Sequence, residues 1–316
     1  MILPFDAITL LRAVEKASAP ASTPVLTRHF SDAGVVPTEL VQVDVITGPE
    51  GLMVAISRDA ESNTAKRESV ESKTFRIPRF SDKFSISPSD LVGYRQPGTQ
   101  NAGPAMAQLI ARRLRNLTNK LNSTKEVMAI RALQGEVSDG AGNVIATYPV
   151  GNDGAINFST TNPREYFDDA AVTISRALRS DNVSLICYVG KDAYQKLLLH
   201  PDVQALLAGP AGPGMLENGV LRTLHGVTIQ RVNGAYTNNA GAETPYLADN
   251  ALITTAVGPY FELYHGPCST PNGVALQQMF VDTWETRDPP ISWTRLESNP
   301  LPIVQRPEAV RKATAA

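Results

Sequence analysis

Hydrophobic and polar side chains alternate in two stretches near the start of the chain. In "LVQVDVITG" (residues 40–48) valines alternate with polar residues, and "TFRIPRFSDKFSIS" (residues 74–87) alternates again. A period of two is typical of β-strands, and Pro78 indicates an edge position or a bulge. We predict a long hairpin with legs of roughly 12 to 18 residues, each spanning about 40 to 60 Å. Because an isolated hairpin is marginally stable in water, a projecting one needs support from outside the chain's own core.

The segment between the two legs, "RDAESNTAKRESVESK" (residues 58–73), holds almost nothing that could join a core. Its positive and negative charges cancel, and they are carried by Arg58, Asp59, Glu61, Lys66, Arg67, Glu68, Glu71 and Lys73. From composition alone this segment could be a disordered linker, a nucleic-acid arm or the tip of the hairpin.

The longest helical pattern runs from Pro104 to about Gln134. Apolar residues recur there at spacings of three and four, namely Met106, Leu109, Ile110, Leu114, Leu117, Leu121, Met128 and Leu133. Proline suits the first turn, Gly135 is a natural stop, and a local irregularity is expected near residues 122–124. Some 30 residues give a rod of roughly 45 Å. The other face of this helix carries Arg112, Arg113, Arg115, Lys120 and Lys125. Such a face is either exposed to solvent or a contact surface for a polyanion.

The remaining pattern predicts shorter elements. We expect an amphipathic helix at residues 6–17, then an extended arm to about residue 40, because Pro20, Pro24, Gly34 and Pro37 prevent a long regular element. The other predicted elements are two short strands around a glycine-rich turn (136–151), helices at 164–178, 191–199 and 201–207, a buried strand at 183–189, strands at 224–232, 244–255 and 260–266, and two long strand-like legs within 274–306 around Asp288-Pro289-Pro290. Residues 307–316 are interpreted as a tail.

Composition and charge reduce the number of functions that the chain could have. Hydrophobic residues make up 42 % of the 316 residues and charged residues 19 %, so the chain can form a core. The formal net charge of −2 disfavours dedicated nucleic-acid binding, which needs a basic excess. Cys187 and Cys268 are the only two cysteines, and they form no disulfide pattern, so the composition is compatible with a reducing compartment. The N-terminus does not resemble a signal peptide, and no apolar run approaches the roughly 20 residues of a membrane helix.

Motifs that carry chemistry are absent from the sequence. The Gly-x-Gly of residues 139–143 lacks a third glycine, and "GPAGPG" (residues 209–214) lacks the lysine of a phosphate-binding loop. His29, His200, His225 and His265 are scattered, without zinc-ligand spacing. We therefore expect no enzyme activity, cofactor or metal, although a site could still assemble from distant residues. The predicted protrusions favour an assembly subunit whose apolar faces need partners.

Four stretches together resemble the major capsid proteins of lambda-type tailed phages, the capsid protein E family. They are residues 6–57 (short helix, arm and a "V-x-V-D-x-I" strand), "KTFRIPRFSDKFSISPSDLVG" (73–93), "YLADNALITTAVGPYFELYHGPC" (246–268) and "ETRDPPISWTRLESNPLPIVQRPEAV" (285–310). The resemblance spans essentially the full length, mostly as order and spacing, and no single motif is specific.

The resemblance implies the α+β Hong Kong 97-like fold. Residues 1–38 are then the N-terminal arm, 39–87 the extended loop, 88–136 with 256–316 the peripheral domain with its spine helix, and 137–255 the axial domain. Residues 58–73 become the tip of the extended loop, and we predict that their charged side chains contact a neighbouring subunit. No covalent cross-link between subunits is predicted.

The resemblance also implies an icosahedral shell of hexamers and pentamers around packaged double-stranded DNA, in a virion made in the bacterial host cytoplasm. The implied partners are a scaffolding protein, a portal, a decoration protein and the DNA, which Arg112, Arg113, Arg115 and Lys120 would contact weakly and without specificity. Three alternatives remain: an encapsulin-type cargo shell, another phage structural part such as a tail or neck subunit, and a soluble α/β enzyme built on residues 155–255. Closed shells or hexamer and pentamer patches in electron micrographs would favour the capsid.

Overall fold

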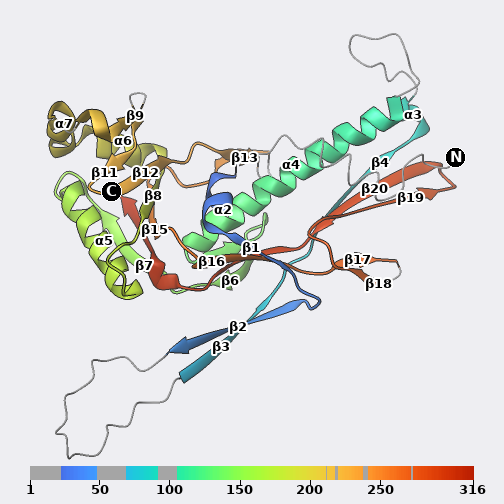
Figure 1. Cartoon of the computed structure of the whole chain (residues 1–316). Helices are drawn as coiled ribbons and strands as arrows, with labels where there is room; N and C mark the ends of the chain where they lie inside the picture. Colours follow the sequence, from blue (N-terminus) through green and yellow to red (C-terminus); the bar gives the residue numbers. More distant parts are fainter. Residues whose placement is uncertain are drawn as a thin grey trace, which may run out of the picture.

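The computed structural model describes residues 23–47, 69–91, 105–210, 212–217, 220–237, 241–271 and 273–316. A body of sheet and helices lies at one end, and a long helix with a three-stranded sheet extends from it (Figure 1). A β-hairpin projects away from both. Helices and strands are thus both major components, which confirms the predicted α+β class.

The body is built on a six-stranded sheet in the order β11–β12–β8–β15–β22–β7. The strands are β7 Gly151–Ile156, β8 Leu185–Val189, β11 Thr223–Leu224, β12 Val227–Arg231, β15 Ala251–Ala256 and β22 Val310–Ala315. The helices of the body are α5 Pro163–Leu178, α6 Lys191–Leu199 and α7 Pro201–Ala208, all three as predicted. Every residue of β8 is buried, Cys187 included, so the predicted buried strand is also confirmed.

The interpretation of residues 307–316 as a tail is wrong. After a short 3₁₀ turn, η1 Pro307–Ala309, they form β22, which pairs antiparallel with β15 and parallel with β7 inside the sheet. The sequence hides this strand because two cations interrupt its small apolar residues. Both cations have partners: Arg311 pairs with Asp153, and Lys312 donates to the carbonyl of Gln134 at 2.8 Å.

The long helix is α4 Ala105–Leu133, of 29 residues, which confirms the helix predicted over residues 104–134. At 1.5 Å per residue it is about 44 Å long. It runs without a break through residues 122–124, where the sequence suggested an irregularity. Gly135 follows it with φ of +92°, a conformation that glycine adopts without strain, and so ends the helix as predicted.

A three-stranded antiparallel sheet packs against the first half of α4. Its strands are β4 Phe80–Ile86, β19 Phe280–Thr286 and β20 Ile291–Ser298, in the order β19–β20–β4, and α3 Pro88–Leu91 follows β4. The two long legs predicted around Asp288-Pro289-Pro290 are β19 and β20. Between this sheet and α4 lies a hydrophobic cluster that is separate from the main core of the body. It consists of Ile86, Leu109, Ile110, Leu114, Leu121, Val281 and Leu296.

Residues 24–35 are packed into the body, so the prediction of an extended arm is wrong for this stretch. They form α2 Pro24–His29 and β1 Ser31–Val35. Strand β1 pairs parallel with β16 Phe261–His265, which pairs antiparallel with β21 Pro300–Val304. The helix predicted at residues 6–17 lies outside the described residues.

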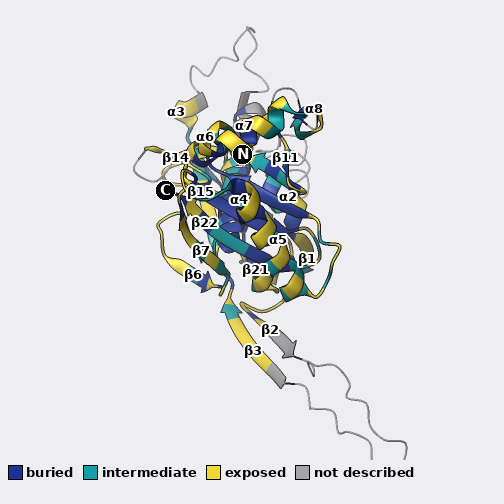
Figure 2. Ribbon diagram, turned by 90° about the vertical axis from the view of Figure 1, so that its left-hand side faces the viewer, coloured by how far each residue is buried: buried dark blue, intermediate teal, exposed yellow. Residues whose placement is uncertain are grey.

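The projecting hairpin consists of β2 Leu40–Thr47 and β3 Ser69–Arg76, paired antiparallel over eight residues (Figure 2). This confirms the two predicted legs as far as the described residues reach. The return leg is not one strand, however. It breaks at residues 77–79, around Pro78, and continues as β4 in the three-stranded sheet.

The remaining elements are short. They are β5 Glu136–Ser138 and β6 Val144–Thr147, predicted around their glycine-rich turn, and β9 Leu216–Glu217, β10 Val220–Leu221, β13 Ala235–Thr237, β14 Glu243–Pro245, β17 Cys268–Thr270, β18 Gly273–Ala275 and α8 Gly212–Met215. The domain limits given above stay a prediction.

Candidate functional site at the base of the projecting hairpin

The hairpin leaves the body through two chain segments that lie side by side. The amide of Ile77 donates to the carbonyl of Glu39 at 2.8 Å, which closes the last rung of the β2–β3 ladder. The side chains of Arg76 and Glu39 form an ion pair at 3.5 Å, and both are mostly exposed. Such exposed pairs are worth about 0 to 1 kcal/mol, so this one contributes little to fixing the hairpin.

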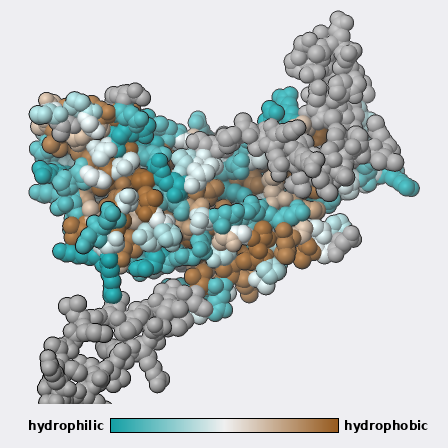
Figure 3. Space-filling model, viewed as in Figure 1, coloured by the Kyte–Doolittle hydropathy of each residue, from teal (hydrophilic) through white to brown (hydrophobic). Residues whose placement is uncertain are grey.

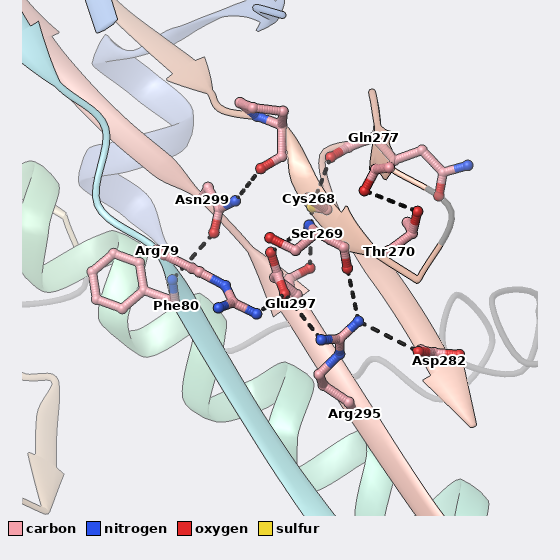
Figure 4. A network of polar contacts seen from close by, with 12 residues as sticks. Arg79, Phe80, Cys268, Ser269, Thr270, Gln277, Asp282, Arg295, Glu297 and Asn299 are labelled. Atoms are coloured by element: carbon pink, nitrogen blue, oxygen red, sulfur yellow. Dashed lines mark hydrogen bonds and ion pairs between the residues drawn. The ribbon is translucent and has the colours of Figure 1, made fainter. Parts of the chain in front are cut away.

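A buried carboxylate lies just beyond this rung. Glu297, in β20, has no solvent exposure, and each of its two carboxylate oxygens accepts a hydrogen bond. Oε2 accepts from Arg79 at 2.8 Å, and Oε1 accepts from the backbone amide of Ser269 at 2.8 Å (Figure 4). A carboxylate taken out of water costs several kcal/mol unless it is paired and hydrogen-bonded, and here both conditions are met.

A second arginine completes the network. Arg295 approaches Oε2 of Glu297 at 3.8 Å, donates to the carbonyl of Ser269 at 2.7 Å and pairs with Asp282 at 3.4 Å. Burial raises the pKa of the Glu297 carboxyl, but the bonds from Arg79 and Ser269 and the charge of Arg295 outweigh it, so the pKa lies below its ordinary value. The carboxylate is therefore ionised at neutral pH.

Asn299 holds the other side of the same turn. Its Oδ1 accepts from the amide of Phe80 at 3.2 Å, and its Nδ2 donates to the carbonyl of Pro267 at 2.6 Å. Its own carbonyl accepts from the amide of Gly266 at 2.8 Å. Glu297 and Asn299 thus tie the turn at residues 77–80 to the segment 266–269.

Polar groups also join the N-terminal segment to the long helix. The carboxylate of Glu126, buried in α4, accepts from the amides of Val25 and Leu26 at 2.9 and 3.0 Å, and so satisfies the N-terminus of α2. Burial raises the pKa of Glu126 and these two bonds oppose the rise. The first described residues are therefore fixed to α4 by a side chain from the middle of the sequence.

A third buried polar group lies where α4, β1 and β16 meet. Nζ of Lys125 lies 3.2 Å from Nε2 of His265, whose Nδ1 lies 3.7 Å from Asp32. Burial lowers the pKa of His265 to about 4, helped by the charge of Lys125 and opposed by Asp32. Burial also lowers the pKa of Lys125 to about 8.

Apolar surface flanks the base of the hairpin. Figure 3 shows hydrophobic surface beside the point where the hairpin leaves the body. Leu40, the first residue of β2, and Val144 are each more than half exposed, and a cleft of about 480 Å³ at this base is lined by Ile77, Pro78, Val144 and Pro267 among others. Exposed apolar groups around a cleft are typical of surfaces that bind another protein.

Most of the predicted contact residues lie outside the described residues, namely Arg58, Asp59, Glu61, Lys66, Arg67 and Glu68. The structure places the other two, Glu71 and Lys73, on β3, where they form an exposed ion pair at 3.4 Å. The pair lies on the projecting part of the hairpin, and its contact with a neighbour stays a prediction.

The structure separates the four predicted DNA-facing residues into two pairs. Arg113 donates to the carbonyl of Ser85, and Lys120 pairs with Asp82 at 2.5 Å, so both attach α4 to β4. Arg112 and Arg115 are exposed.

The cleft beside the second half of α4 does not support the enzyme alternative. It has a volume of about 450 Å³ and contains Arg131. That guanidinium donates to Ser138, to the carbonyl of Asp139 and to the hydroxyl of Tyr236, so it connects structural elements. In the part of the chain that the structure describes, no cluster of three metal-ligating side chains occurs, and no helix is long and apolar enough to cross a membrane.

Comparison with known proteins decides the family. The family model of phage major capsid protein E matches residues 6–315. The chain belongs to that family. It is 25 % identical over 327 residues to the major capsid protein of Salmonella phage Felix O1, covering 88 % of each chain. This phage capsid protein is therefore a component of the virion.

The solved structures agree on the fold. The putative capsid protein of a prophage of E. coli CFT073 superimposes with a TM-score of 0.66 at 13 % identity over the whole of both chains. An encapsulin complex of Synechococcus elongatus PCC 7942 gives 0.52 at 12 % identity, covering 99 % of this chain and 96 % of that one. The Hong Kong 97-like fold is confirmed. Since the fold is shared with an encapsulin, it is the family match that favours the capsid over the cargo shell.

Sequence reasoning missed the buried network altogether. Glu297 lies in the run "TRLESNP", where nothing distinguishes it from an exposed glutamate, and Arg79 lies in a return leg that was interpreted as hairpin. The one available signal was its position: three polar residues, Glu297, Ser298 and Asn299, lie between apolar Leu296 and the "PLPIV" strand. A charge inside such a run has to find partners.

Proposed function

We propose that copies of this capsid protein assemble through their projecting hairpins into hexamers and pentamers of an icosahedral shell around packaged double-stranded DNA. The observation that carries the proposal is the β2–β3 hairpin, which extends beyond the core of its own chain with exposed apolar surface at its base. A two-stranded ribbon is marginal alone in water, and a neighbouring subunit supplies the missing support.

The charged tip, residues 58–73, is the proposed contact with the neighbour. Each exposed ion pair contributes only about 0 to 1 kcal/mol, but a shell repeats the contact in every subunit. Charges of both signs favour one orientation of the neighbour over others.

Electron microscopy of the purified full-length chain tests the proposal. We expect closed shells, or hexamer and pentamer patches, when the chain is expressed with the scaffolding protein that we propose as its partner. A stable monomer at high concentration would count against assembly altogether.

Deletion of residues 60–70 tests the role of the hairpin. We expect the variant to keep the far-UV circular dichroism and thermal unfolding of the parent but to lose assembly or shell stability. A matched control replaces the same eleven residues with a Gly-Ser linker of equal length, which keeps the reach of the loop and removes four of its eight charges. Normal, stable particles from the deletion would remove the tip from the assembly contact.

DNA contact is proposed as weak and non-specific, and we assign it to the exposed pair Arg112 and Arg115. A net charge near zero supports this, because a strongly basic inner wall would hold DNA that must enter and leave. Anisotropy with a labelled duplex should show weak binding that disappears as salt rises. The double variant Arg112→Ala/Arg115→Ala should weaken it more than Arg164→Ala/Lys191→Ala, which removes equal charge from the body. Tight, salt-resistant or sequence-specific binding would contradict the proposal.

We also propose that a portal and a decoration protein bind this capsid protein and that it has no enzymatic activity. The support for both is the membership in a capsid family. Co-purification of particles with the products of neighbouring phage genes identifies such partners directly.

A further inference from the structure

The direction in which the hairpin leaves the body is not set by its own strands. Between β3 and β4 only three residues, 77–79, connect one sheet to another. One of them is Pro78, which has no amide hydrogen to donate to either ladder. Contacts outside the β2–β3 ladder therefore fix the angle between the hairpin and the three-stranded sheet: Val41 and Ile77 are buried in the hydrophobic core, and polar side chains hold the turn itself.

We propose that the buried carboxylate of Glu297 is the positioning residue that sets the direction of the hairpin. From its place in β20 it accepts hydrogen bonds from two other segments, the turn through Arg79 and β17 through the amide of Ser269, while Arg295 of its own strand lies 3.8 Å away as an ion-pair partner (Figure 4). A completely buried carboxylate is strongly destabilised if it loses a partner. Only an arrangement that brings all three segments together satisfies it, so the carboxylate selects one orientation.

The neighbouring contacts act in the same sense. The side chain of Asn299 accepts a hydrogen bond from the amide of Phe80, the first residue of β4, and donates one to the carbonyl of Pro267. The backbone of Gly266 approaches Ile77 so closely that an added Cβ would lie 2.9 Å from the side chain of that residue. The turn is thus held from β20 and packed against the segment that leads into β17.

The ion pair between Arg76 and Glu39 provides an internal comparison. It lies three residues away from Arg79, at the same end of the hairpin, but both of its side chains are mostly exposed. Arg79 is itself 54 % exposed, whereas its partner Glu297 is completely buried. Removal of either arginine deletes one positive charge from the surface, but only removal of Arg79 takes a charged partner from a buried carboxylate.

Small errors in this angle become large at the far end of the strands. Eight residues at about 3.3 Å each give roughly 26 Å, so a rotation of about 10° at the base moves the end of the paired strands by roughly 5 Å. This consequence for assembly rests on the proposed function of the hairpin. The positioning role itself is a property of the single subunit and can be measured there.

Spin-label distances on the full-length subunit test the inference. Labels are attached at Thr74→Cys on β3 and Glu285→Cys on β19, two exposed positions. Cys187 and Cys268 are buried, and labelling of the parent chain measures any background from them. We expect one narrow distance distribution for the doubly labelled parent and for Arg76→Ala. Arg79→Ala and Glu297→Gln should shift the distribution or at least double its width, and Arg79→Lys should restore most of the parent distribution.

The outcomes separate this inference from the proposed function. If Arg79→Ala gives the same distribution as Arg76→Ala, the positioning role is wrong, whatever the particles look like. If Arg79→Ala broadens the distribution while its shells keep normal diameter and closure, the positioning role stands and the assembly role of the hairpin is wrong. Should Glu297→Gln fail to fold, Arg79→Ala still decides, because its side chain is more than half exposed.

Discussion

The six-stranded sheet and the projecting hairpin obtain their stability in opposite ways. In the sheet, all five residues of β8 and all six of β15 are buried. In the hairpin, the side chains from Glu71 to Thr74 are exposed, and contacts with the body lie near the base, where Val41 is buried and Phe75 contacts Tyr148, with ring centroids 5.5 Å apart. The body is stabilised within one subunit, whereas we propose that the exposed surface of the hairpin contacts another. Mutations in the two regions should therefore affect different measurements.

The largest difference should come from the cores. Phe167 is fully buried in α5. The substitution Phe167→Ala should lower the free energy of unfolding by about 3 to 5 kcal/mol, because loss of the ring leaves a cavity. The hairpin substitution Val43→Ala should cost less than about 1 kcal/mol. Urea unfolding of the isolated subunit measures both. Equal losses would show that the hairpin belongs to the same cooperative core.

The site where α4, β1 and β16 meet, outside both regions, should be sensitive to acid. The pKa of His265 is about 4 in the folded protein against an ordinary 6.5, so the unfolded chain binds the proton first as pH falls. Stability should therefore decrease from pH 6.5 to about 4, by at most about 3 kcal/mol for this one group. The groups that face the imidazole are Lys125 from α4 and Asp32 from β1. His265→Gln should flatten the slope of unfolding free energy against pH, and an unchanged slope would exclude His265 as the source.

A smaller effect should follow from the cap of α5 in the body. Oδ1 of Asn162 accepts from the amide of Arg164 at 2.9 Å at the N-terminus of this helix. Asn162→Ala should destabilise the subunit by about 1 kcal/mol, and Asn162→Ser should recover most of it because serine also caps. Thermal unfolding of the two variants against the parent measures this. If both variants lost stability equally, the cap would not be the cause.

The smallest effect should be on the hairpin surface. Lys73→Ala breaks the exposed pair with Glu71 and should change subunit stability by about 0 to 1 kcal/mol, less at high salt. Its consequence should instead be visible in the salt concentration at which assembled particles dissociate. A subunit that unfolds more easily but assembles normally would reverse the comparison.

Much of this architecture could be predicted from sequence because local patterns set it. The stripe of α4, the buried run of β8 and the alternation of β2 each indicate one element without any partner. Long-range pairing was not accessible in this way. Strand β22 contains two cations, the turn at residues 77–79 is marked only by Pro78, which fits an edge position or a bulge equally well, and α2 is capped by Glu126 from a hundred residues away. The site was missed for the same reason, since Arg79 and Ser269, which bind Glu297, lie 218 and 28 residues away from it in the sequence.

The position of β22 has a consequence for the timing of synthesis. Its neighbours β7 and β15 leave the ribosome well before it, and the sheet cannot close between them until residue 315 is available. Until then, both strands present an unpaired edge. A chain that stops before residue 310 therefore lacks an inner strand of its sheet. The last strand to be synthesised is thus the one that joins β7 to the rest of the sheet, so truncation before it removes β7 from the sheet as well.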